Sequence, residues 1–198
     1  TATERMRIDS SGKVGIGTTS PMNRLQLSHT GANGDNGLMI VREDTTTAAD
    51  DLLGGIGFDS TDGNVPSSIL EASAYVAGYA SEAHGTDDKG GYLTFGTSSE
   101  NDNDDTTATE RMRITDEGNV GIGTTSPDSN LHISSGTSGD CILTLEADTD
   151  NNDENDNCFI IFKQDGGIPE SAIYTGHNYL NISNSIHPNG GIIFLTGT

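Results

Sequence analysis

The sequence contains no tryptophan, few other aromatic residues and a hydrophobic fraction of only 31 % over 198 residues. Ordinary globular domains carry about 45–50 % apolar residues when glycine is counted. This chain approaches that range only through its 26 glycines, which have no side chain to bury. A single copy can therefore build only a thin hydrophobic core, and we expect partner chains to complete it.

Basic residues are scarce as well: nine lysines and arginines stand against 30 acidic residues, for a formal net charge of −21. Binders of nucleic acid carry basic surface stripes, so this charge argues against that class and against anionic membrane surfaces. No run of about 18 apolar residues occurs, so the sequence predicts no membrane insertion. Short alternating apolar runs at residues 141–145 and 159–162 indicate strands rather than disorder.

An internal repeat organises the chain. Residues 1–21 and 107–127 are identical at 17 of 21 positions. Fainter matches continue along the unit: Leu25 and Leu27 with Leu131 and Ile133, Phe58 with Phe162, Asp62-Gly63 with Asp165-Gly166, Pro66 with Pro169, and Gly90-Gly91 with Gly190-Gly191. We therefore predict two tandem units, residues 1–106 and 107–198, the second stopping just before a third copy would start.

Each copy of the repeated motif predicts a β-hairpin. Apolar residues alternate with arginines before a turn at residues 9–12, and alternate with glycines after it. We expect these apolar residues to form one buried, inward face per unit: Met6, Ile8, Val14 and Ile16, with Met112, Ile114, Val120 and Ile122. Arg5 and Arg7 then point away from that face.

The glycines of the hairpin have two interpretations. A glycine within a strand often marks the close approach of another backbone, and a glycine after a short strand serves as a loop residue. The sequence leaves both open for Gly15, Gly17, Gly121 and Gly123. Because no stretch has a convincing helical period, the predicted fold class is all-β, built as two tandem β-rich repeats of the β-helix, β-prism or β-sandwich kind.

The motif ERMRI-x3-G-x-VGIGTTSP, followed by L-x-[IL]-S, resembles repeats in the tail fibres and receptor-binding proteins of bacteriophages. It spans residues 4–21 and 110–127, with residues 25–28 and 131–134 after them. The resemblance implies an elongated homotrimeric fibre segment, extracellular and part of a virion tail fibre. Similar repeats occur in bacterial surface proteins, so a bacterial cell-surface filament is the alternative. No self-cleaving chaperone motif is present in these 198 residues.

The sequence also predicts the contacts of the motif arginines and the state of the two cysteines. We expect the arginines of the motif to pair with carboxylates of a neighbouring strand or chain, Glu4 and Glu110 among them. We expect both cysteines, Cys141 and Cys158, to be buried thiols. If residues 141–147 and 158–163 form a hairpin, one cysteine lies near its turn and the other near its open end, too far apart for a disulfide.

Candidate chemistry is sparse. Asp148, Asp150 and Asn152 begin like a calcium loop with alternating oxygen ligands, but the run lacks the glycine and the terminal glutamate of such loops, so a solvated loop is the alternative. The five histidines show no metal-binding spacing. No phosphate loop, nucleophile elbow or carboxyl group isolated in an apolar run occurs. We therefore predict no enzyme and no cofactor, with calcium as the one candidate ion.

Three functions follow from these observations. The leading hypothesis is a structural shaft segment of a trimeric fibre that serves host attachment, with self-association as its main interaction. The second is an adhesive module that binds a host-surface glycan or protein through the divergent loops 44–51, 82–90 and 148–157. The third and least favoured is a polysaccharide depolymerase, which would use a pair of carboxylates.

Overall fold

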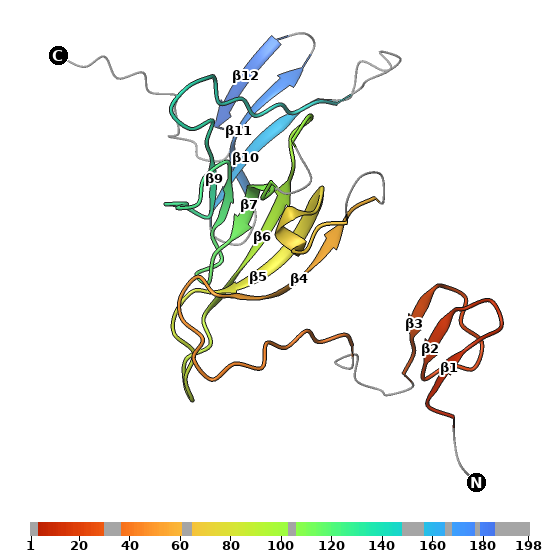
Figure 1. Cartoon of the computed structure of the whole chain (residues 1–198). Coiled ribbons are helices and arrows are strands. Elements are labelled where there is room, and N and C mark those ends of the chain that lie inside the picture. Colours follow the sequence, from red (N-terminus) through yellow and green to blue (C-terminus); the bar gives the residue numbers. More distant parts are fainter. Residues whose placement is uncertain are drawn as a thin grey trace. The chain divides into compact units, whose positions relative to one another are not determined.

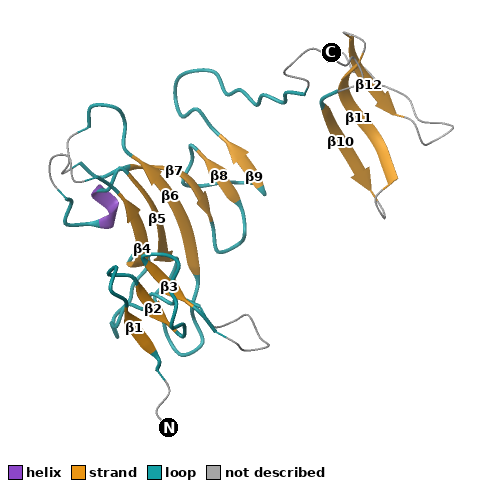
Figure 2. Ribbon diagram, turned by 90° about the vertical axis from the view of Figure 1, so that its right-hand side faces the viewer, coloured by secondary structure: helices purple, strands orange, loops and turns teal. Residues whose placement is uncertain are grey.

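The computed structural model describes residues 4–29, 37–60, 65–102, 106–147, 157–164, 168–176 and 179–184. These residues form twelve β-strands and one turn of 3-10 helix, and no α-helix occurs among them (Figures 1 and 2). The predicted all-β fold class is confirmed. The chain divides into two compact units, Thr1–Gly139 and Asp140–Thr198, each described here by itself.

The first copy of the motif forms a small sheet of three strands, β1 (Met6–Ile8), β2 (Val14–Ile16) and β3 (Leu25–Leu27). Strands β1 and β2 are antiparallel with Met6 opposite Ile16 and Arg7 opposite Gly15, which is the predicted register. Strand β3 then pairs with β2 in parallel. Met6 and Ile8 do share one face, but these two residues and Ile16 are exposed and Val14 is half-buried, so the predicted burial of this face is wrong.

The hairpin glycines are approached by backbone from the same chain. A Cβ on Gly15 would lie 2.8 Å from the carbonyl oxygen of Thr18, and one on Gly121 would lie 2.5 Å from that of Thr124. Gly17 follows β2 directly and has a φ of +74°, a left-handed conformation that glycine adopts without strain. Both interpretations therefore hold: these glycines are closely approached, and Gly17 is also a turn residue.

The largest sheet has six strands: β4 (Leu52–Phe58), β5 (Ala74–Ala80), β6 (Gly91–Thr97), β7 (Thr109–Ile114), β8 (Val120–Ile122) and β9 (Leu131–Ile133). They lie side by side in chain order, antiparallel except for the parallel pair β8–β9. Strands β4 to β6 belong to the first predicted repeat and β7 to β9 to the second. Backbone hydrogen bonds between β6 and β7 therefore join the two predicted repeats, whose boundary lies between residues 106 and 107.

One face of this sheet is covered by the 3-10 helix η1 (Ile69–Glu71), which lies against β4 and β5 (Figure 2). Glycines in β4 let it approach, since a Cβ on Gly55 would lie 2.6 Å from the Ile69 side chain. The buried hydrophobic residues of the described chain are Tyr75 and the alanines Ala72, Ala77, Ala80 and Ala108. The core is therefore as thin as the composition predicts.

The second unit contains a meander of three antiparallel strands, β10 (Phe159–Gln164), β11 (Ile168–Gly176) and β12 (Tyr179–Asn184). Residues 141–147 form no strand, so β10 pairs with β11 instead of a preceding segment. Cys141 is consequently exposed, and its predicted burial is wrong. Both cysteines are thiols, and Cys158 is half-buried with its thiol donating to the Leu145 carbonyl oxygen at 3.0 Å.

Candidate assembly interface

The uncovered face of the six-stranded sheet carries its large aliphatic side chains. Residues directly opposite each other on neighbouring strands point to the same side of a sheet. The strand register therefore aligns one apolar row across all six strands: Ile56, Val76, Phe95, Met112, Ile122 and Ile133. A second row runs beside it: Gly78, Leu93, Ile114, Val120 and Leu131. We call these two rows the open face.

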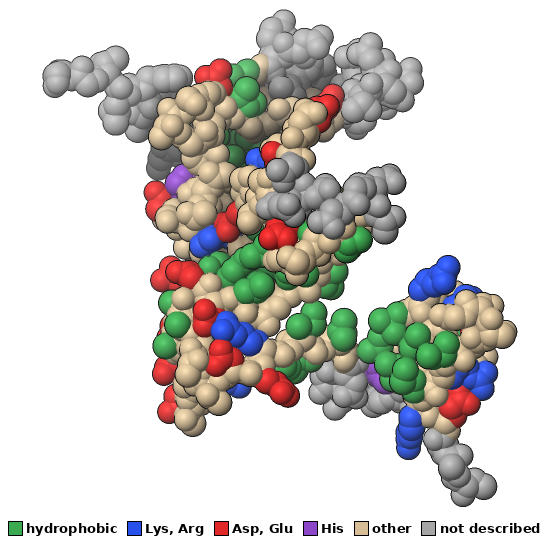
Figure 3. All heavy atoms as spheres, viewed as in Figure 1, with side chains coloured by type: hydrophobic (Ala, Val, Ile, Leu, Met, Phe, Trp, Pro, Cys, Tyr) green, Lys and Arg blue, Asp and Glu red, His purple; other side chains and the backbone are tan. Residues whose placement is uncertain are grey.

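Much of the open face is in contact with solvent. Ile56, Leu93, Ile122 and Leu131 are exposed, and the remaining side chains of the two rows are half-buried. Figure 3 shows hydrophobic side chains gathered over β4 to β6. Contiguous apolar surface of this kind usually marks an interaction site in a soluble protein.

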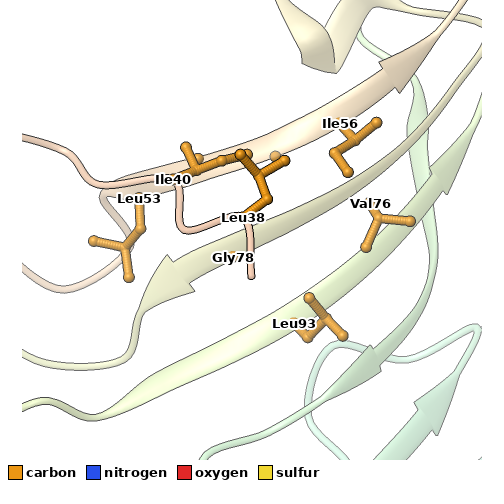
Figure 4. A pocket seen from close by; sticks show the side chains of 9 residues that line it. Leu38, Ile40, Leu53, Ile56, Val76, Gly78 and Leu93 are labelled. Carbon is orange, nitrogen blue, oxygen red and sulfur yellow. The ribbon is translucent and has the colours of Figure 1, made fainter. Parts of the chain in front are cut away.

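One corner of the open face is partly covered by the segment that precedes β4. Leu38 and Ile40 of that segment lie above the strands, and the shallow groove between them and the sheet is lined by Leu53, Ile56 and Leu93 (Figure 4). Leu38 and Ile40 are themselves exposed. The segment therefore extends the apolar surface and does not seal it.

The opposite face holds a polar and aromatic cluster. Arg113 donates to both carboxylate oxygens of Glu110, at 2.7 and 2.8 Å, and its guanidinium lies 4.5 Å from the centre of the Tyr92 ring. That ring stacks on Tyr79 at 5.2 Å, and its hydroxyl donates to Asp50 at 2.9 Å. Burial, followed by the hydrogen bond with Asp50, raises the pKa of Tyr92 to about 12. These contacts fix the strands without offering an apolar surface.

Glu4 and Glu110 are arginine partners as predicted, but each pair lies three residues apart on the same segment, and not on a neighbouring strand or chain as expected. Arg7 donates to Glu4 at 2.6 Å in the first copy, which matches the pair of Arg113 with Glu110 in the second. Arg111 instead donates to the hydroxyl groups of Thr97 and Ser99. The motif arginines thus make local structural contacts.

Two of the three divergent loops lie side by side. In loop 44–51 the carbonyl oxygen of Thr47 accepts a hydrogen bond from the backbone N–H of His84 in loop 82–90, at 3.1 Å. The backbone N–H of Gly90 then donates to the Glu82 carboxylate at 2.8 Å, which closes the second loop on itself. The third loop lies outside the described residues apart from Asn157.

The predicted calcium ligands Asp148, Asp150 and Asn152 also lie outside the described residues. Elsewhere in the described chain, no group of three histidine, cysteine or acidic side chains is placed to hold a metal ion. The same residues contain no helix long and apolar enough to cross a membrane.

Several exposed carboxyl groups have a pKa below the ordinary value, because they accept hydrogen bonds. The donors are Arg7 for Glu4, the Lys13 backbone for Asp9, the Thr46 hydroxyl for Asp44 and the Ser60 backbone for Asp59. An acid catalyst needs the opposite shift. These four carboxylates therefore stay ionised at neutral pH.

No protein-family model and no curated protein matches this chain. Among solved structures, it is similar to the carboxy-terminal domain of the bacteriophage T5 L-shaped tail fibre, with a TM-score of 0.41, 12 % identity and 79 % of each chain covered. The same domain with its intramolecular chaperone domain gives a TM-score of 0.44 and 11 % identity, covering 79 % of this chain and 55 % of that one.

Proposed function

We propose that this chain is a structural, non-enzymatic shaft segment of an extracellular trimeric fibre, of the kind that serves host attachment in phage tail fibres. The open face carries the proposal. It presents the largest aliphatic side chains of the sheet to solvent, while the covered face buries mainly alanines. In a trimer, the open faces of three chains pack together and form the core that one chain lacks.

The repeated motif supports the fibre part of the proposal. Its second copy continues the sheet of the first repeat, so each further repeat extends the same structure by strand pairing. A binding or catalytic site needs only one copy, whereas a shaft gains length from each copy. The sequence resemblance to tail-fibre repeats favours a virion fibre over a bacterial surface filament.

Sedimentation velocity and light scattering test the trimer directly. We expect a mass near three chains of 20.7 kDa, about 62 kDa, with a frictional ratio typical of an elongated particle. Ile56→Lys places a charge in the open face, where the side chain is already exposed in one chain, so it should lower the trimer fraction without unfolding the monomer. Ser126→Lys, in an exposed turn, is the matched control. A wild-type chain that sediments as a compact monomer contradicts the proposal.

An adhesive role is a second candidate, favoured by the two loops that lie side by side. Hydrogen bonds hold loops 44–51 and 82–90 together, and such a preformed loop surface is suited to binding a glycan or a protein. Binding to a glycan array that is lost when residues 85–89 are replaced by a short glycine linker would support this role. If neither the wild-type chain nor the variant binds, the adhesive role is rejected and the shaft role is the one that stands.

A further inference from the structure

Two short segments have the sequence of a β-strand but form no strand in the single chain. Residues 38–41 read Leu-Met-Ile-Val, and residues 141–145 read Cys-Ile-Leu-Thr-Leu. A short run of apolar and β-branched residues is typical of a strand that is buried on both faces. Both segments lie within the described residues, and neither belongs to a strand or a helix there. This difference between sequence and structure requires an explanation.

The first segment is apolar on both of its sides. Its four side chains are exposed over 50 to 82 % of their surface. Leu38 and Ile40 turn toward the open face (Figure 4). Successive side chains of an extended chain point to opposite sides, so Met39 and Val41 point away from the sheet. Within the described chain, one side of the segment is therefore covered incompletely and the other is in solvent.

The backbone of the same segment has no hydrogen-bond partner among the described residues. Its N–H and C=O groups, at residues 38–41, form none of the hydrogen bonds of that part of the chain. Arg42, the next residue, is held at the start of β4: it donates to the Leu52 carbonyl oxygen at 3.4 Å and pairs with Asp51 at 3.1 Å. Buried backbone groups are almost always paired, so covering this segment requires a strand that supplies hydrogen bonds.

The second unit repeats the arrangement. Three of the four side chains at residues 142–145 are exposed aliphatic groups. Leu143 and Leu145 line a shallow groove together with residues of β10, β11 and β12. The described residues form no backbone–backbone hydrogen bond with this segment either. In each unit an apolar extended segment thus precedes the first strand of a sheet, and that strand, β4 or β10, has a neighbour on one side only within the described chain.

We propose that residues 38–41 of one chain form a β-strand on the outer edge of β4 in a second copy of the chain, and that residues 142–145 pair with β10 in the same way. An open strand edge is a template for pairing with another chain. A second copy is the partner that fits two such segments, because it presents the two edges in the same tandem order. The inference rests on the trimer proposed above and adds the strand contact that joins its chains.

This contact joins unlike surfaces, a segment of one chain and a strand edge of the next. Such a contact closes into a ring when the rotation between copies permits. In a three-fold ring each chain gives one segment and receives one at every level, so no edge is left over. Added beside β4, the segment continues the neighbour's six-stranded sheet, and alternate side chains of the segment extend the open face. Both alternate pairs in residues 38–41 are apolar, as that face requires.

Hydrogen exchange tests the inference in the assembled protein. In the wild-type trimer, amides of residues 38–41 that face the partner should exchange at least about a hundredfold more slowly than in monomers obtained with Ile56→Lys. The amides of the exposed turn at residues 9–12 are the internal control and should exchange equally in both. Trimers in which residues 38–41 exchange at the unprotected rate overturn the inference and leave the shaft role intact. Protection that persists in the monomer shows pairing within one chain and overturns it as well.

Proline at two adjacent positions is the independent test. Consecutive N–H groups of a strand point to opposite edges, so either Met39→Pro or Ile40→Pro removes a donor to the partner strand. The described single chain loses no hydrogen bond, because both groups are unpaired in it. At one of the two positions we expect trimer formation, measured by sedimentation over a range of concentrations, to weaken about tenfold or more relative to alanine at the same position, which keeps the N–H.

The possible failures are distinguishable. If both proline variants form trimers as well as their alanine counterparts, the strand contact is rejected while the trimer stands. A wild-type chain that forms no trimer contradicts the proposed function, and with it this inference.

Discussion

Alanine in place of Gly123 should destabilise the sheet much more than alanine in place of Gly118. Both glycines have positive φ, +71° and +84°, so each substitution carries the cost of a left-handed conformation, about 1–2 kcal/mol. Their surroundings differ. A Cβ on Gly118 meets nothing within 4 Å, whereas a Cβ on Gly123 would overlap the carbonyl oxygen of Ser134.

The overlap adds a second cost at Gly123. Ser134 donates its backbone N–H to the Ile122 carbonyl oxygen at 2.9 Å, at the end of the parallel pair β8–β9. Moving Ser134 away from the new Cβ strains or breaks that bond, about 0.5–1.5 kcal/mol. Overpacking against the displaced backbone adds about 1–3 kcal/mol. We therefore expect Gly123→Ala to cost about 1.5–4.5 kcal/mol more than Gly118→Ala.

Thermal unfolding followed by circular dichroism at one fixed protein concentration measures the difference. For a chain of this length, 1 kcal/mol corresponds to about 2–4 °C, so the melting temperatures of the two variants should differ by about 3 °C at the least. The first copy offers an independent pair, since a Cβ on Gly17 would overlap the carbonyl oxygen of Ser28, whereas a Cβ on Gly12 meets nothing within 4 Å. Equal melting temperatures for Gly123→Ala and Gly118→Ala would refute the close-approach argument.

Two further predictions concern the polar cluster on the covered face. Because the pKa of Tyr92 rises from 10.0 to about 12 on folding, its contribution to stability is complete below pH 10 and is lost as the pH rises toward 12. The melting-temperature advantage of wild type over Tyr92→Phe should therefore shrink between pH 10 and about 12, and a constant difference in melting temperature would contradict the raised pKa. Glu110→Gln should destabilise the chain by about 1–3 kcal/mol in urea unfolding, because Arg113 then loses its charged acceptor in a half-buried site. Glu4→Gln, at the more exposed pair, should destabilise the chain clearly less, because solvent screens an exposed ion pair, and equal effects of the two substitutions would contradict this prediction.

Local patterns in the sequence were sufficient to predict the hairpin of the motif. Alternation of apolar residues with arginines or glycines fixes which side chains share a face, and a turn with glycine at its end fixes the register. The structure accordingly pairs Met6 with Ile16 and Ile8 with Val14. The scarcity of basic residues beside abundant acids predicted that the motif arginines pair with carboxylates such as Glu4, but not that the pair lies within one segment.

The pairing of strands that are distant in the sequence could not be predicted from local patterns. Strand β4 has the sequence LLGGIGF, whose glycines interrupt any alternation, so the pattern does not show that Ile56 faces outward and Gly55 faces the 3-10 helix. The parallel pairing of β3 on β2 likewise has no signature within three residues. Burial of Met6 and Ile8 was predicted from their alternation, but burial also requires a neighbour, which the alternation does not supply.

The six-stranded sheet does not coincide with one repeat, because it joins the end of the first repeat to the start of the second. This arrangement explains why the two copies are nearly identical in the motif and differ elsewhere. In the second copy, the motif satisfies two sets of contacts at once: β7 pairs with β6 of the preceding repeat, and β8 pairs with β9 of its own. A change in the motif therefore disturbs contacts on both sides. Strands β4 and β5 pair with each other, and β5 pairs with β6 of the same repeat, so they can vary in compensation with one another. A shaft of such units should accordingly tolerate substitutions in β4 and β5 better than in β7.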